Sequence, residues 1–255
     1  MHVDYRKALF ISDAHLKDPG DENHRAILAF LDGELRKIDE GSGIDALMIV
    51  GDFFDVWINN YSVPVRYRPV MSRLEAFFQK GVSIHFFEGN HDFFMGRLFK
   101  KRTGAVVHPD GADITIQGLR LYITHGDRAN KYNTGARLLR WILRSPVIWL
   151  ITLIAPTGAV ERVGSLMGKM SRREHDDEMY LEYAVSDHVR EFCGEKKGEG
   201  FDGVVIGHYH AQVMAKPDDG SGFPCLYINT GRWGWGKYHY TMLEGGEFRN
   251  LEFLF

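Results

Sequence analysis

Short apolar runs rich in β-branched and aromatic residues recur along the chain and predict buried strands. These runs are residues 8–12, 46–50, 82–87, 119–124, 203–206 and 226–229. Two segments between the first three runs instead repeat apolar residues at helical spacing, from Ile27 to Ile38 and from Val70 to Phe78. Strands that alternate with helices in this way favour βαβ units and a largely parallel sheet.

The pattern changes after Asp113. Residues 114–117 and 119–124 flank Gly118, and residues 238–243 and 248–253 flank Gly245 and Gly246. Two strands joined by a short glycine-containing turn are typical of a β-hairpin. The sequence therefore predicts an α/β fold with a mixed sheet or with two sheets packed together.

Residues 128–195 do not follow this alternation and are helical by composition. From residue 141 to 155 the chain is apolar except at Arg144, Ser145, Thr152 and the helix breaker Pro146. Only residues 147–155 lack both charge and proline, whereas a bilayer span needs roughly 20 residues, so we expect no span. Two interpretations remain, the interior of a small helical bundle or an apolar surface for a lipid substrate or a membrane interface.

The net charge of −3, from 31 basic and 34 acidic residues, conceals an uneven distribution. Between residues 128 and 173 there are nine basic residues and a single acidic one, Glu161, so this segment carries +8 and the rest carries −11. If the segment forms an apolar surface, we expect Arg137, Arg140, Arg144 and Arg162 to surround it and to favour anionic headgroups. The total charge gives no reason to expect nucleic acid as a partner.

Composition excludes several protein classes. With 44% apolar and 25% charged residues, the chain is neither disordered nor collagen-like, and 255 residues suit one large α/β domain. Cys193 and Cys225 lie 32 residues apart outside any CxxC pattern, which favours a reducing compartment. The first apolar run, residues 8–11, is too short for a signal peptide, so we expect a cytoplasmic protein.

Side chains that bind metals follow five of the predicted strands. They are Asp13, His15, Asp52, Asn90, His125, His208 and His210. Ligands of open α/β sheets bind at the carboxyl ends of strands. A lone Asp-x-His or Gly-His-x-His is more often structural, but five such segments in order argue against coincidence. Carboxylates mixed with imidazoles suit Mn, Fe or Zn, and one carboxylate can bridge two ions.

The spacing of these segments locates an insertion. Asp13 and Asp52 are 39 residues apart, Asp52 and Asn90 are 38 apart, and Asn90 and His125 are 35 apart, each about one strand-helix-strand unit. His125 and His208 are 83 apart. The longer interval contains the basic, apolar segment. We therefore predict a core of residues 1–127 and 196–255 with a helical insertion, or lid, of residues 128–195.

The run Asp-x-His, Gly-Asp-x-x-Asp, Gly-Asn-His-Asp, His and Gly-His-x-His resembles the signature of the calcineurin-like metallophosphoesterases over most of the chain outside the insertion. The resemblance implies an αββα two-sheet sandwich with a dinuclear metal site. One ion would be held by Asp13, His15, Asp52 and His210, and the other by Asp52, Asn90, His125 and His208, with Asp52 bridging. It also implies that His91 donates to the leaving group or the phosphoryl oxygens, and that Asp55 orients His91.

Two divalent ions suit phosphoester hydrolysis. At a separation of about 3.5–4 Å they lower the pKa of a bridging water and neutralise charge on the phosphoryl oxygens. In-line attack on phosphorus then needs no covalent enzyme intermediate. We expect Mn²⁺, with Fe or Zn as alternatives.

Within this superfamily the chain most resembles the UDP-2,3-diacylglucosamine diphosphatases of lipid A biosynthesis. The shared features are the segments 51–57, 125–127 and 229–233 and the helical insertion that follows Asp127. The best-known members carry Arg at the position of His91 and Glu at that of Asp55. Their insertion also has a Lys-bearing Ser/Asn segment where this chain has residues 171–175.

The resemblance implies attack by water on the α-phosphorus of UDP-2,3-diacylglucosamine, which gives UMP and 2,3-diacylglucosamine 1-phosphate. An apolar, basic insertion suits this lipid-linked nucleotide, since each buried CH₂ contributes about 0.8 kcal/mol and the diphosphate attracts cations. We expect substrate contacts from Asp127, Arg137, Arg140, Arg172 and Arg232. We also expect peripheral contact with the cytoplasmic face of the inner membrane and no obligate protein partner.

Two alternatives remain. Another calcineurin-like phosphoesterase, such as a phosphodiesterase, nucleotidase or protein phosphatase, would share all seven ligands, although nucleotidases and protein phosphatases act on water-soluble substrates that do not need an apolar insertion. The second alternative is a non-enzymatic scaffold of this fold. Such scaffolds typically lose ligands, and none is missing here.

Overall fold

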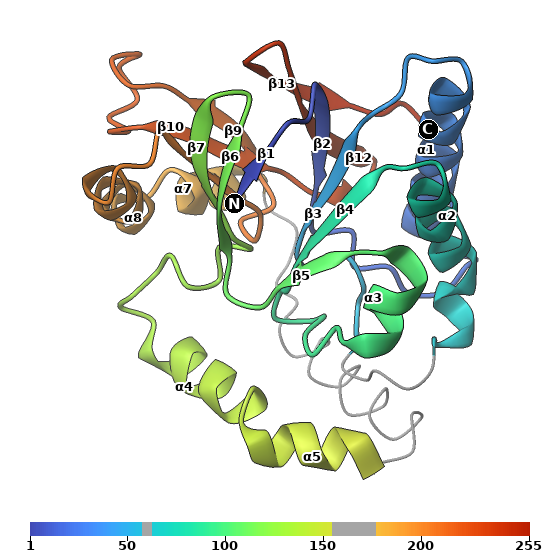
Figure 1. The fold of residues 1–255 in the computed structure, drawn as a ribbon. Coiled ribbons are helices and arrows are strands. Elements are labelled where there is room, and N and C mark those ends of the chain that lie inside the picture. Colours follow the sequence, from blue (N-terminus) through green and yellow to red (C-terminus); the bar gives the residue numbers. More distant parts are fainter. Residues whose placement is uncertain (58–62, 155–176) are drawn as a thin grey trace.

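Two β-sheets packed face to face form the centre of the protein (Figure 1). A computed structural model describes residues 1–57, 63–154 and 177–255. Sheet A has the strand order β1-β6-β7-β8-β10-β9, and sheet B has the order β11-β12-β2-β3-β4-β5 with β13 paired to β12. The strands of sheet A are β1 (His2–Val3), β6 (Ala112–Ile116), β7 (Leu119–Ile123), β8 (Gly203–Ile206), β9 (Gln212–Ala215) and β10 (Leu226–Thr230). Those of sheet B are β2 (Lys7–Ile11), β3 (Ala46–Val50), β4 (Ser83–Phe87), β5 (Val106–His108), β11 (Trp233–Gly234), β12 (Lys237–Glu244) and β13 (Glu247–Glu252).

Both sheets are mixed, but the strands that precede the candidate site are parallel. In sheet B, β2, β3, β4 and β5 run in the same direction, and β12 is antiparallel to β2. In sheet A, β7, β8 and β10 run parallel. The carboxyl ends of the parallel strands therefore gather at one edge of each sheet.

Helices α1 (Glu22–Asp39), α2 (Arg68–Gln79), α3 (Arg97–Thr103) and α8 (Asp187–Gly198) cover the outer faces of the sandwich. The described residues also form the short η1 (Val65–Tyr67), α4 (Thr134–Leu143), α5 (Pro146–Ile154) and α7 (Asp177–Ala184). Phe30 of α1, Leu74 of α2 and Phe99 of α3 belong to the buried cluster on sheet B. Val189 and Cys193 of α8 pack with residues of β8 and β10 on sheet A.

A third apolar cluster fills the space between the sheets. Phe10, Met48 and Phe87 of sheet B meet Leu121 and Val205 of sheet A there. Alternate residues of each strand thus face either this inner layer or the helices, as the pleat of a strand requires. The order of layers is helix, sheet, sheet, helix, which confirms the predicted αββα sandwich.

The six predicted strands and both hairpins are present, within one residue at each end except for β6, which begins two residues earlier than predicted. The two helices predicted between the first strands are α1 and α2. Sequence patterns did not reveal β1, β5, β9, β11 and α3. These elements are short, with two to seven residues each, so they carry too few positions for a period to emerge.

The insertion begins with α4 and α5, which extend away from the sandwich (Figure 1). Many of their apolar side chains are exposed, among them Leu138, Leu139, Trp141, Ile142, Val147, Trp149, Leu150 and Ile151. These two helices thus present an exposed apolar surface, as expected if the segment faces a lipid substrate or a membrane interface. Arg162 and Arg172, named above for the rim and for substrate contact, lie outside the described residues.

The predicted boundary at residues 195 and 196 falls inside α8. Because α8 packs on sheet A, a boundary before α8 would keep the helix with the sheet that it covers. The division into a core and an insertion at 128–195 stays a prediction. Among the described residues, no helix is both long and apolar enough to cross a membrane.

Candidate metal centre

Ligand atoms from both sheets converge where their parallel strands end. Asp13 and His15 follow β2 and Asp52 follows β3, whereas His208 and His210 follow β8. His210 Nε2 lies 3.3 Å from Asp13 Oδ1, and it lies 3.4 Å from His15 Nε2. These three side chains form one compact group whose ligand atoms are all within 4.8 Å of one another.

A second group surrounds Asp52. His125 Nε2 lies 3.4 Å from Asp52 Oδ2, 3.3 Å from Asn90 Oδ1 and 3.3 Å from His208 Nδ1. His15 Nε2 lies 3.9 Å from the same Asp52 oxygen, so Asp52 stands between the two groups. All seven predicted ligands are therefore brought together, with Asp52 central.

The donor atoms fit divalent cations. Facing imidazole nitrogens, such as the pair on His15 and His210, present lone pairs to each other unless a proton or a metal lies between them. Asp13 Oδ1 is buried, and within the described residues its close neighbour is the ring of His210, another candidate ligand. His125 Nδ1 donates to the Val50 carbonyl at 2.9 Å, which leaves Nε2 available to a metal. Carboxylate, amide and imidazole ligands together suit two ions of the Mn, Fe or Zn type.

The electrostatics of Asp52, His15 and His208 favour the ionised carboxylate and the neutral imidazoles that bind metals, whereas His125 without a metal is held in its protonated form. Burial raises the pKa of Asp52, but the charges of His125 and His91 outweigh this and hold it well below its ordinary value. Burial lowers the pKa of His15 to about 3 and that of His208 to about 4. Despite its burial, His125 has a pKa raised to about 10 by Asp52. Asp52 thus attracts positive charge to this point.

The backbone at the site is unusual. Nine non-glycine residues in the described part of the chain have positive φ, and five of them are Asp13, His15, Asp52, His208 and His210. This region is sterically costly for residues with a Cβ atom, and such strain gathers at functional sites. The loops thus adopt conformations that aim the ligands inward.

Two glycines of the motifs allow the loops to approach the ligands. A Cβ atom at Gly207 would lie 2.6 Å from Asp13 Oδ2, and one at Gly89 would overlap the Asp52 carboxylate. Neither residue can carry a side chain without displacing a ligand. The glycines of Gly-Asn-His-Asp and Gly-His-x-His are therefore required by close packing around the site.

Asp92 organises the loop that carries Asp52, a function not foreseen from the sequence. Its carboxylate is buried and accepts hydrogen bonds from the backbone N–H groups of Asp52, Phe53, Phe54 and Gly89 at 2.6–3.1 Å. One side chain thereby fixes the segments that follow β3 and β4. The sequence feature that could have identified Asp92 is its position as the last residue of the Gly-Asn-His-Asp motif.

His91 lies beside the metal ligands, with Nε2 3.9 Å from Asp52 Oδ2. Its other ring nitrogen, Nδ1, is 2.9 Å from the backbone carbonyl of Asp55. The described contact between these two residues thus involves the main chain of Asp55 and not its carboxylate. A donor hydrogen on Nδ1 leaves Nε2 directed toward the site.

A pocket of about 200 Å³ opens over the ligands. Its lining comprises His15, Lys17, Asn23, Asp52, Asp55, Asn90, His91, Met179, Tyr180, Tyr183, His208, His210 and Trp235. One wall belongs to α7, where the ring of Tyr180 packs 5.0 Å from that of His210. Lys17, Asn23 and the α7 residues were missed because no sequence pattern shows which segment covers a site.

The residues expected to contact substrate have other partners. Arg140 pairs with Asp127 and, at 3.2 Å, with Asp110, while Arg137 donates to the Lys131 carbonyl at 3.0 Å. Arg232 is buried and pairs with Asp177 of α7 at 2.7 Å. None of these residues lines the pocket of about 200 Å³.

Arg140 and Arg144 also differ from their expected place on the rim of the apolar surface. Arg144 pairs with Glu88 at 2.8 Å, and both arginine side chains are largely buried toward the core. The carboxylates of Glu88, Asp110 and Asp127 attract them inward. Arg137 remains exposed on α4.

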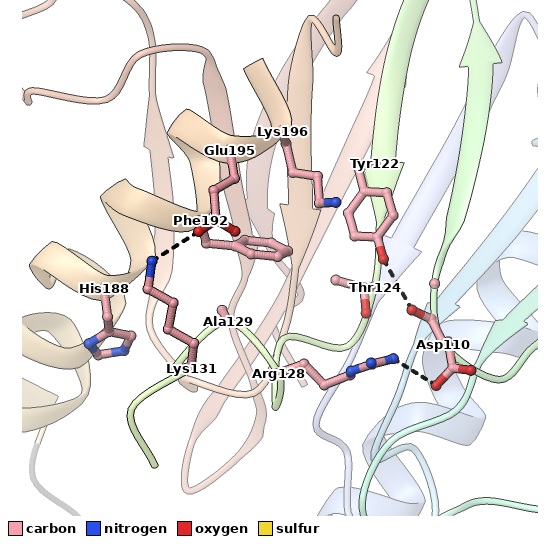
Figure 2. A pocket seen from close by; sticks show the side chains of 11 residues that line it. Asp110, Tyr122, Thr124, Arg128, Ala129, Lys131, His188, Phe192, Glu195 and Lys196 are labelled. Carbon is pink, nitrogen blue, oxygen red and sulfur yellow. Dashed lines mark hydrogen bonds and ion pairs between the residues drawn. The ribbon is translucent and has the colours of Figure 1, made fainter. Parts of the chain in front are cut away.

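A second pocket, of about 340 Å³, lies between α8, β7 and the segment 128–131 (Figure 2). It contains none of the predicted metal ligands. Its cations are neutralised locally, because Arg128 pairs with Asp110 at 2.9 Å, Lys131 with Glu195 at 3.0 Å and Lys196 with Glu199 at 2.8 Å. The first pocket is therefore the better candidate for an anionic substrate.

Comparison with known proteins agrees with the geometry. Residues 6–212 match the calcineurin-like phosphoesterase family. A Pseudomonas aeruginosa protein named UDP-2,3-diacylglucosamine hydrolase is 29% identical over 89% of this chain and 92% of its own length. A protein of the same name from Escherichia coli is 29% identical over 81% of this chain and 82% of its own length. One from Aeromonas salmonicida is 35% identical over 52% of this chain and 50% of its own length. The chain belongs to the calcineurin-like phosphoesterase family and is a metal-dependent hydrolase.

Proposed function

We propose that this enzyme hydrolyses the diphosphate of UDP-2,3-diacylglucosamine by attack of water on the α-phosphorus, giving UMP and 2,3-diacylglucosamine 1-phosphate. The observation that carries the proposal is the combination of a metal-binding pocket with the exposed apolar surface of α4 and α5. The names of the relatives support the same substrate.

Two divalent ions, for which we propose Mn²⁺, would occupy the ligand groups. Asp13, His15, Asp52 and His210 would hold one ion, and Asp52, Asn90, His125 and His208 would hold the other. Bound there, such ions activate water and neutralise charge on the phosphoryl oxygens. The chain supplies fixed positions for these ligands through the strained loops after β2, β3 and β8.

His91 would donate a proton to the leaving group or a hydrogen bond to a phosphoryl oxygen. Its Nδ1 is occupied by the Asp55 carbonyl, so Nε2 is the nitrogen that faces the substrate. The pocket that holds His91 is partly enclosed by Met179, Tyr180 and Tyr183 of α7, which reduces the access of bulk water.

The apolar surface of α4 and α5 would bind the acyl chains and rest on the membrane surface. Trp141, Val147 and Leu150 are 72%, 66% and 55% exposed, which is unusual for such large apolar residues. Arg137 lies on the same helix as Trp141 and would attract anionic headgroups. We therefore place the enzyme at the cytoplasmic face of the inner membrane by peripheral contact.

The test supplies the full chain with Mn²⁺ and, in parallel, UDP-2,3-diacylglucosamine, bis(p-nitrophenyl) phosphate and a phosphopeptide. We expect UMP from the first substrate at the highest kcat/KM. Turnover of only the two water-soluble substrates would refute the proposal. Asp52→Ala should lose both bound metal and hydrolysis, and full activity of that variant in Mn²⁺-replete buffer would contradict the dinuclear site.

A further inference from the structure

Lys17 lies in the pocket as part of a rigid loop. The backbone N–H of Leu16 donates to the Phe53 carbonyl at 3.0 Å, and the N–H of Asp55 donates to the Leu16 carbonyl at 3.0 Å. Leu16 is fully buried in the apolar core, whereas its neighbours His15 and Lys17 both line the pocket. The fixed backbone at Leu16 thus holds Lys17 beside the metal ligands.

Among the described residues that line this pocket, Lys17 is the sole lysine or arginine. Within the described residues its half-buried side chain forms no ion pair and no hydrogen bond. The three cations of the second pocket differ in this respect, since each is paired with a carboxylate. Figure 2 shows two of these pairs, Arg128 with Asp110 and Lys131 with Glu195. An unpaired cation held close to an anion-binding site is available to a charged ligand.

The charges of a diphosphate diester match this arrangement. Such a substrate carries about one negative charge on each phosphate, and ions bound at the ligand groups would neutralise the phosphate that is attacked. The second phosphate then enters the pocket without a cation of its own. Burying it unpaired would be costly, so a nearby ammonium group has a clear energetic effect.

We propose that Lys17 binds the second, unattacked phosphate and so makes the enzyme selective for diphosphate diesters over monophosphate diesters. This inference rests on the proposed function, because it assigns a residue to one part of that substrate. It concerns binding alone and requires no proton transfer by Lys17.

The test measures binding directly and does not depend on turnover. Methylenediphosphonate, which resists hydrolysis, and inorganic phosphate are titrated by calorimetry into the Mn²⁺-loaded full chain at equal metal content. Lys17→Met removes the charge, Lys17→Arg retains it, and Lys101→Met, on the exposed surface of α3, is the matched control. For Lys17→Met we expect the Kd of methylenediphosphonate to rise roughly 10-fold or more, the effect of losing one charge-assisted hydrogen bond.

The Kd of inorganic phosphate should change less than about 3-fold in Lys17→Met, and Lys17→Arg should bind both probes within about 3-fold of the wild type. Equal weakening of both probes, no weakening of either, or failure of the wild type to bind methylenediphosphonate more tightly than phosphate would each overturn the proposal. If selective binding is found but UDP-2,3-diacylglucosamine is not hydrolysed, the assignment of Lys17 stands and the proposed natural substrate fails.

Discussion

Arg144 Nη1 lies 2.8 Å from Glu88 Oε2, and this ion pair joins the end of α4 to the loop that carries Asn90 and His91. The same guanidinium donates to the Gly89 carbonyl at 3.0 Å, while the other oxygen of Glu88 accepts from the Met95 N–H at 2.8 Å. The insertion is thus attached to the metal-binding loop at a largely buried point.

Arg144→Ala should lower the free energy of unfolding by about 3 kcal/mol, because it leaves the buried Glu88 carboxylate without its cationic partner. Urea denaturation measures this change. Arg137→Ala, at an exposed position on α4, should cost less than about 0.5 kcal/mol. A double-mutant cycle with Glu88→Ala that shows no coupling energy would disprove the interaction.

Because His91 contacts the main chain of Asp55 and not its carboxylate, substitutions of the two residues should have different effects on activity. His91→Ala should lower kcat by roughly 10²–10⁴-fold, the usual effect of losing a proton donor. Asp55→Asn retains the carbonyl that holds the ring, so we expect a loss below about 10-fold. Steady-state kinetics at equal metal content compares the kcat of the two variants with that of the wild type. A loss in Asp55→Asn as large as that in His91→Ala would show that the Asp55 carboxylate itself is needed.

Gly89→Ala should displace the Asp52 carboxylate, because the added Cβ would overlap it. We expect the variant to bind less metal and to hydrolyse phosphoesters more slowly, with far-UV circular dichroism unchanged. Elemental analysis gives the metal content. Gly20→Ala is the control, since no atom lies within 4 Å of its added Cβ and its φ is negative. Normal metal content in Gly89→Ala would show that the loop adjusts.

A buried histidine pair should make the protein sensitive to acid. His85 and His108 stack with Nδ1 and Nε2 3.0 Å apart, and burial lowers the pKa of each to about 4. Between pH 6.5 and 4 the unfolded chain binds more protons at these positions, so stability falls as the pH falls through this window. His85→Gln should flatten the decrease relative to the wild type, as measured by urea denaturation from pH 8 to pH 4. If the free energy of unfolding of His85→Gln falls with pH as steeply as that of the wild type, this histidine pair does not cause the loss of stability in acid.

The exposed apolar surface predicts membrane binding. The double variant Trp141→Ser with Leu150→Ser should sediment less with vesicles that contain phosphatidylglycerol, because less apolar area enters the interface. Val65→Ser, at another exposed apolar position outside α4 and α5, should bind like the wild type. If the double variant and the wild type sediment equally, these helices do not contact the lipid.

Patterns along the chain predicted the elements that form the layers of the sandwich. Long runs such as residues 46–50 are buried on both faces and contrast with their surroundings. Strand β9, with three partly buried residues and one buried residue, has less contrast with its surroundings, and β1 has only two residues. Their pairing with β10 and β6 arises from tertiary contact, which periodicity does not report.

The seven candidate ligands could be named from the sequence because strand ends at one edge must lie close together. Partners of long cationic side chains could not be named in this way. Arg232 was expected at the substrate, but it forms an ion pair with Asp177 of α7, which is 55 residues earlier in the chain. Lys17, although only two residues beyond His15, carries no motif. Its place in the pocket depends on how Leu16 is fixed in the core.

The candidate ligands are divided between the two sheets, four at the edge of sheet B and three at the edge of sheet A. Neither sheet alone contains either of the two ligand sets proposed above. We therefore expect hydrolysis to require both sheets in their docked positions, and a chain that has folded one layer without the other to be inactive. Metal ions bound by ligands from both sheets would stabilise the packing of sheet A on sheet B. A chelator should therefore weaken the contact between the sheets before it disturbs the structure of either sheet.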